Sequence, residues 1–120
     1  MTGVQTCAFR SRTRVTRYFW GFAFLSLAAH ADLDAGLRAF EAGDYATAFE
    51  ILRPLATHHG YERAMNQLGA MYENGWGVER DGHRAATWYE KSALEGYSRA
   101  MYNLGLLYAE GKLKIGRAHV

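Results

Sequence analysis

The side chains that could bind a metal are scattered along this sequence of 120 residues. His58 and His59 are adjacent, so on a helix they point about 100° apart, whereas ligands that share a metal lie three or four residues apart on one face. His83 stands alone near the start of another predicted helix. These histidines are typical of solvated helix ends, and no metal site is predicted.

Carboxylates show no clearer catalytic pattern. Five of them surround one predicted helix pair and its loop, with no nucleophile or base beside them: Glu73, Glu79, Asp81, Glu90 and Glu95. A glycosidase-like pair is therefore not favoured. The spacing Gly75-x-Gly77 resembles a phosphate loop, but no strand precedes it and no P-loop lysine follows it. Trp76 is either a ligand-stacking ring or an anchor for the loop, and the anchor is favoured.

Two stretches of the chain that are 36 residues apart repeat one another. Residues 60–75 align with residues 96–111, and nine of the 16 positions are identical. Apolar residues at helical spacing predict a buried stripe in each stretch: Ala64, Leu68, Met71 and Tyr72, then Ala100, Leu104, Leu107 and Tyr108. Gly69 and Gly105 lie inside these helices at a cost of about 1 kcal/mol each, so we expect a neighbouring helix to approach closely at both.

Helix caps and stops divide this part of the chain into five predicted helices, over residues 32–42, 45–58, 62–73, 82–95 and 98–110. Asp44 and Asp81 are placed as N-caps, and Gly75 as a stop. Pro54 should kink the second helix because it removes a backbone hydrogen bond. The fourth helix has an apolar face made of Ala85, Ala86, Trp88, Tyr89 and Ala93. The pattern predicts an all-α fold, an α-solenoid of antiparallel helix-turn-helix repeats that stack on their neighbours.

These units resemble a known family. The run Ala64-x-x-x-Leu68-Gly69-x-x-Tyr72-x-x-Gly75-x-Gly77-Val78-x-x-Asp81, continued by Ala85-Ala86-x-Trp88-Tyr89-x-Lys91-x-Ala93-x-x-Gly96, is similar to the Sel-one-like repeat (SLR) family of tetratricopeptide-like solenoids. Ser92 departs from it, because alanine is usual there. The resemblance covers a complete repeat over 61–96, the first helix of a truncated repeat over 97–113 and, more loosely, a helix pair over 32–60. It implies a scaffold that binds proteins or peptides and has no catalytic residues.

The resemblance also implies where a partner would bind. In tetratricopeptide-like solenoids the first helix of each pair lines the concave surface. The candidate contacts are therefore the residues that point away from the apolar stripes: Arg63, Asn66, Gln67, Ala70 and Glu73, then Arg99, Tyr102, Asn103, Leu106 and Ala109. Tyr102 and Leu106 are apolar for an exposed face, and they could equally contact a further helix.

Both ends of the chain resemble translated sequencing adapter. Residues 114–118 can be encoded by a DNA word that we identify as the core of a short-read adapter, and its reverse complement, with one base lost, translates to Ala8-Phe9-Arg10-Ser11. Residues 1–11 and 114–120 are therefore interpreted as artefacts. The natural gene is expected to continue past Leu113.

Residues 12–31 have the order of a secretory signal peptide. Three arginines precede an apolar run over residues 18–29, which is followed by the small-x-small site Ala29-His30-Ala31. The apolar run is shorter than the roughly 20 residues of a membrane-spanning helix. We expect cleavage after Ala31, and the alternative is a buried N-terminal helix.

Charge and cysteine usage exclude further classes. The whole chain is basic, with 14 Lys and Arg against 12 Asp and Glu. All the acids but only eight of the bases lie within residues 32–113, which leaves this part with a net charge of −4. An acidic surface argues against a nucleic-acid partner. The only cysteine, Cys7, lies in the adapter-like segment, so the remaining chain has no thiol for a disulfide or a nucleophile.

We therefore expect an exported, periplasmic or secreted repeat scaffold that binds a protein or peptide, is not an enzyme and needs no cofactor. The alternatives are a binding module of a longer envelope protein or enzyme, and a repeat protein that binds an envelope glycan. No stable membrane span is expected after signal cleavage. The last predicted helix lacks its partner helix, so the fragment should fray or self-associate there.

Overall fold

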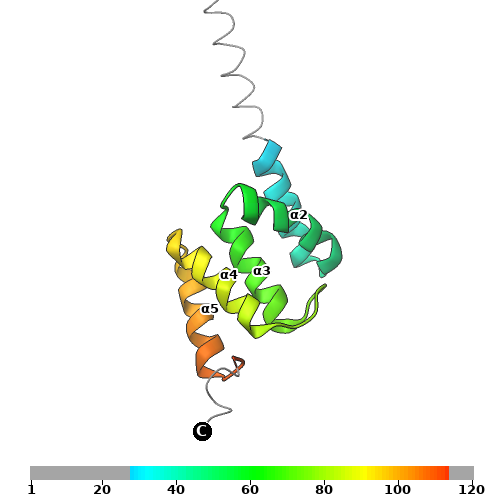
Figure 1. The fold of residues 1–120 in the computed structure, drawn as a ribbon. Helices are drawn as coiled ribbons and strands as arrows, with labels where there is room; N and C mark the ends of the chain where they lie inside the picture. The colour runs from blue at the N-terminus through cyan, green and yellow to red at the C-terminus, as the bar shows by residue number, and fades with distance from the viewer. Residues whose placement is uncertain (1–27, 114–120) are drawn as a thin grey trace, which may run out of the picture. The chain divides into compact units, whose positions relative to one another are not determined.

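The computed structural model of this chain describes residues 28–113, and all regular structure within them is helical. A helix over residues 28–41 is followed by α2 (Tyr45–His58), α3 (Glu62–Asn74), α4 (Gly82–Leu94) and α5 (Ser98–Ala109), as Figure 1 shows. The predicted all-α class is confirmed. The predicted helix ends are correct to within one residue, except that the first helix begins earlier. The adapter-like ends and most of the predicted signal peptide lie outside the described residues.

Local capping explains where the helices begin and end. The Asp44 carboxylate accepts a hydrogen bond from the backbone N–H of Thr47 at 3.3 Å, and Asp81 accepts two, from His83 at 3.0 Å and Arg84 at 3.1 Å. Both side chains satisfy donors that have no partner inside a helix. Gly75 ends α3 in the left-handed conformation, with φ of 72°, which a residue without a Cβ adopts at little cost.

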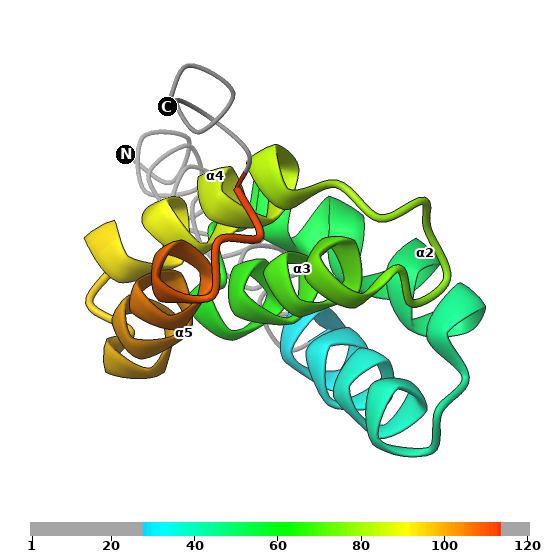
Figure 2. The ribbon, with the colours of Figure 1, turned by 90° about the horizontal axis from the view of Figure 1, so that it is seen from below.

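The helices stack as successive layers. Within residues 45–113, α3 contacts α2, α4 and α5, and α4 also contacts α5. Figure 1 shows α3 between α2 and α4, and Figure 2 shows α5 beside both α3 and α4. The side chains that fill these contacts include Ala48, Leu52, Ala64, Leu68, Met71, Ala85, Tyr89, Ala100 and Leu107. Each helix therefore buries its apolar stripe against its neighbours, as expected for a solenoid.

Trp76 anchors the loop that joins α3 to α4. Its ring stacks on Tyr45, with centroids 4.9 Å apart and planes 8° apart, and meets Phe40 edge-on at 5.8 Å. Gly77 makes this approach possible, because a Cβ there would lie 2.9 Å from the Tyr45 carbonyl group. The loop therefore reaches back to α2, as Figure 2 shows. The Gly75-x-Gly77 spacing serves this packing.

Burial differs from the predicted stripes at several positions. Tyr108 was expected to be buried, yet its side chain is 53% exposed, because it lies on a flank of α5 that no described helix covers. Its counterpart Tyr72 is half-buried and packs edge-on against Phe49 of α2. Leu104, Trp88 and Ala93 are half-buried. No helix among residues 28–113 is long and apolar enough to cross a membrane.

Ser92 is a buried residue that the predicted stripe of α4 omitted. It is fully buried, and its hydroxyl donates a hydrogen bond to the backbone carbonyl of Glu62 at 2.7 Å. The bond satisfies a polar group that would otherwise be costly to bury. The departure from the alanine that is usual in the family therefore links α4 to the start of α3.

Candidate binding surface

An amide pair joins the two helices that carry the candidate contacts. The side-chain amide of Asn103 in α5 donates a hydrogen bond to the Asn66 oxygen in α3 at 2.9 Å, and the Asn66 amide donates one to Gln67 at 3.0 Å. Asn66 is buried, so it holds α3 and α5 together and offers no exposed side chain to a partner. This corrects the expectation that Asn66 lies on the open face.

The other candidate residues remain accessible around this pair. Arg63 and Arg99 are exposed near the starts of α3 and α5, and Gln67, Ala70 and Asn103 are half-buried. Tyr102 is 67% exposed, and Leu106 is exposed as well. We call this set the α3–α5 surface: Arg63, Gln67, Ala70, Arg99, Tyr102, Asn103 and Leu106. Tyrosine and arginine contribute strongly to binding at many protein interfaces, so the composition suits a polypeptide partner.

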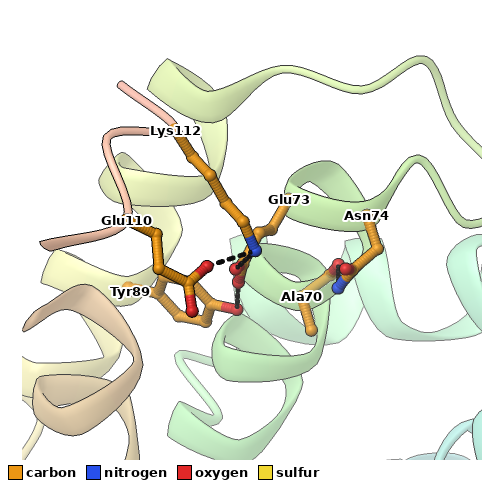
Figure 3. A network of polar contacts seen from close by, with 6 residues as sticks. All are labelled: Ala70, Glu73, Asn74, Tyr89, Glu110 and Lys112. Atoms are coloured by element: carbon orange, nitrogen blue, oxygen red, sulfur yellow. Dashed lines mark hydrogen bonds and ion pairs between the residues drawn. The ribbon is translucent and has the colours of Figure 1, made fainter. Parts of the chain in front are cut away.

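A second polar cluster lies at the other ends of these helices (Figure 3). The Tyr89 hydroxyl donates a hydrogen bond to one oxygen of Glu73 at 2.7 Å, and the Lys112 ammonium lies 2.7 Å from the other. Lys112 also pairs with Glu110 at 2.8 Å. Every charged group here is occupied by another member of the cluster. The arrangement ties α3, α4 and the segment after α5 together, and it leaves no free base or nucleophile at this point.

The cluster changes the acidity of two of its members. Burial raises the pKa of Tyr89 well above its ordinary value, and the hydrogen bond to Glu73 raises it further. Hydrogen bonds to Glu110 and then to Glu73 raise the pKa of Lys112. Both groups therefore hold their protons in the folded protein at a pH where the unfolded chain releases them.

Stability should consequently fall in alkaline solution. Above about pH 10, where free tyrosine and lysine titrate, the folded state binds more protons than the unfolded state, so the free energy of unfolding decreases as pH rises. The contribution is complete below that pH and is lost as pH rises through the raised values. Urea denaturation at several pH values measures this slope. The double variant Tyr89→Phe/Lys112→Met should flatten it, and an unchanged slope would contradict the assignment.

The histidines and the remaining carboxylates do not converge. His59 stacks on Tyr61 with ring centroids 5.9 Å apart, and His83 is exposed at the start of α4. Within residues 28–113 no three His, Cys, Asp or Glu side chains are grouped so that they could hold a metal ion. A polar cleft of about 490 Å³ lies between the start of α4 and the segment after α5, where it is lined by Arg80, Asp81, His83, Glu110 and Lys112. The Asp81 carboxylate there already caps α4.

Comparison with known proteins places this geometry in a family. The Sel1 repeat matches the chain twice, over residues 62–97 and over residues 98–117. The crystal structure of a Sel1 repeat protein from Oxalobacter formigenes is similar, with 33% sequence identity and a TM-score of 0.59. The match covers 67% of this chain and 32% of that one. This chain thus spans about a third of that solved chain. No curated protein matches the sequence significantly.

The stacked helix pairs and the two family matches together define an all-helical repeat protein. The chain belongs to the Sel1-like repeat family. Sel1 repeats commonly serve as scaffolds for protein interactions, and they are typically non-catalytic.

Proposed function

We propose that this chain is an exported repeat scaffold that binds a protein or peptide through the α3–α5 surface and catalyses no reaction. The observation that carries the proposal is the exposure of Tyr102 and Leu106 beside Arg99 on α5. The Asn66–Asn103 bond fixes this patch against α3, so the surface is already ordered before a partner binds. A preorganised surface loses less conformational entropy on binding.

Substitution of the two apolar contacts tests the surface. The double variant Tyr102→Ser/Leu106→Ser should lose at least about tenfold in affinity for a captured partner, because truncated anchor residues often cost more than 1 kcal/mol each. The measurement is quantitative pull-down from an envelope extract, followed by titration with the purified partner. Leu94→Ser is the matched control, because Leu94 is an exposed apolar residue of α4. Equal loss in the control would contradict binding through the α3–α5 surface.

Export is proposed from the basic, apolar and Ala-x-Ala order of residues 12–31. When the chain is expressed in a Gram-negative host, the mature protein should accumulate outside the cytoplasm with Asp32 as its first residue. Cell fractionation and N-terminal sequencing provide the measurement. An Ala29→Gln/Ala31→Gln variant should remain uncleaved because it loses the small residues of the cleavage site. If the unaltered chain is recovered only in the cytoplasm and uncleaved, the export proposal fails.

A further inference from the structure

The same four residue types occur at the same spacing on α3 and on α5. Met65, Leu68, Gly69 and Tyr72 recur 36 residues later as Met101, Leu104, Gly105 and Tyr108. On a helix these four positions lie on one flank, which differs from the flank that carries Tyr102 and Leu106. We call the second set the Met101 face. Because the two sets are identical in side-chain chemistry, whatever covers the first set indicates what fits the second.

Other helices cover the set on α3. Leu68 is fully buried and Met65 nearly so. A Cβ added to Gly69 would lie 2.6 Å from the Tyr89 ring, so this ring of α4 rests directly on the glycine. Tyr72 packs against Phe49 of α2 with centroids 6.0 Å apart. The set on α3 is therefore a seat for an apolar helix face, and Gly69 provides the space for an aromatic ring.

The Met101 face is open. Met101 is 57% exposed and Tyr108 is 53% exposed. A Cβ added to Gly105 would meet no atom within 4 Å. Beside this face runs an apolar groove of about 350 Å³, lined by Met101 and Leu104 from α5 and by Glu90, Ala93 and Leu94 from α4. Exposed apolar surface rimmed by polar residues is typical of an interaction site.

We infer that the Met101 face binds an amphipathic α-helix of a partner polypeptide, which places an aromatic ring on Gly105 as Tyr89 does on Gly69. The inference specifies a partner for the proposed binding function but uses a separate flank of α5. The ring needs no hydroxyl. Glu73, which accepts the Tyr89 hydrogen bond, corresponds to Ala109 in the second set, and alanine offers no side-chain acceptor. Phenylalanine should therefore serve at least as well as tyrosine.

A peptide of residues 80–96, acetylated and amidated, is the probe because it contains α4, which already fits the equivalent face. It is titrated against the full chain by fluorescence anisotropy, at a concentration where sedimentation shows a monomer. Saturable binding is expected. A Tyr89→Ala peptide should bind at least about tenfold more weakly, as for a lost aromatic anchor. A Tyr89→Phe peptide should bind at least as tightly as the original.

Variants of the full chain locate the binding site. Gly105→Leu should abolish peptide binding because it fills the seat, and the open space around Gly105 lets the fold accept it. The Tyr102→Ser/Leu106→Ser variant should bind the peptide normally, so that failure of the α3–α5 surface and failure of the Met101 face are told apart.

Four outcomes would overturn the inference. The first is no saturable binding of the peptide to the unaltered chain, and the second is undiminished binding to Gly105→Leu. The third is self-association of the chain that Gly105→Leu abolishes, which would assign the face to a second copy. The fourth is resistance of Met101 to oxidation in the free monomer, which would show that the chain covers the face itself.

Discussion

Replacing Tyr89 with alanine is expected to lower the free energy of unfolding by about 3–5 kcal/mol, the range for truncating a buried aromatic side chain. The side chain is 1% exposed and fills the contact between α3 and α4. Its ring rests on Gly69, so truncation leaves a cavity that the glycine cannot fill. The change also removes the hydroxyl that donates to Glu73.

Tyr89→Phe separates the ring from the hydroxyl. It keeps the packing and loses only the hydrogen bond to the Glu73 carboxylate, for which a cost of about 1–3 kcal/mol is expected. Urea denaturation of the two variants and the parent gives the three free energies. If Tyr89→Ala costs no more than Tyr89→Phe, then the ring contributes nothing to the α3–α4 contact, and the packing argument is wrong.

Gly69→Leu is expected to lower the free energy of unfolding by about 1–3 kcal/mol through overpacking. The first added carbon would already lie 2.6 Å from the Tyr89 ring. The ring is not free to move away, because it is buried and its hydroxyl is bonded to Glu73. Leucine is the better helix former by up to about 1 kcal/mol, so the steric cost must exceed this gain.

Gly105→Leu is the matched control for this steric effect. It makes the same change at the equivalent position of the next repeat, where a Cβ would meet nothing within 4 Å. Its helix propensity should therefore raise the melting temperature or leave it unchanged. Thermal unfolding followed by circular dichroism measures both variants. A Gly69→Leu protein that melts above its parent would show that the α3–α4 contact can open without loss.

The sequence by itself determined the helices, because their signals are local. Asp44 and Asp81 each bond to backbone groups within three residues, and Gly75 stops α3 by its own backbone conformation. These interactions do not depend on distant parts of the chain, so predicted and observed ends agree to within one residue for α2 to α5. The 36-residue period also determined the class of fold, because a repeated apolar stripe is buried only by stacking.

The tertiary structure decided which copy of each repeated feature is covered. Tyr72 and Tyr108 are equivalent in sequence, and so are Gly69 and Gly105, yet only the first of each pair meets a described neighbouring helix. Asn66 looked exposed by periodicity but is buried by its bond to Asn103, 37 residues away. Lys112 reaches Glu73 across 39 residues. Burial and pairing of this kind depend on which helix lies opposite a residue, and helical periodicity carries no information about that neighbour.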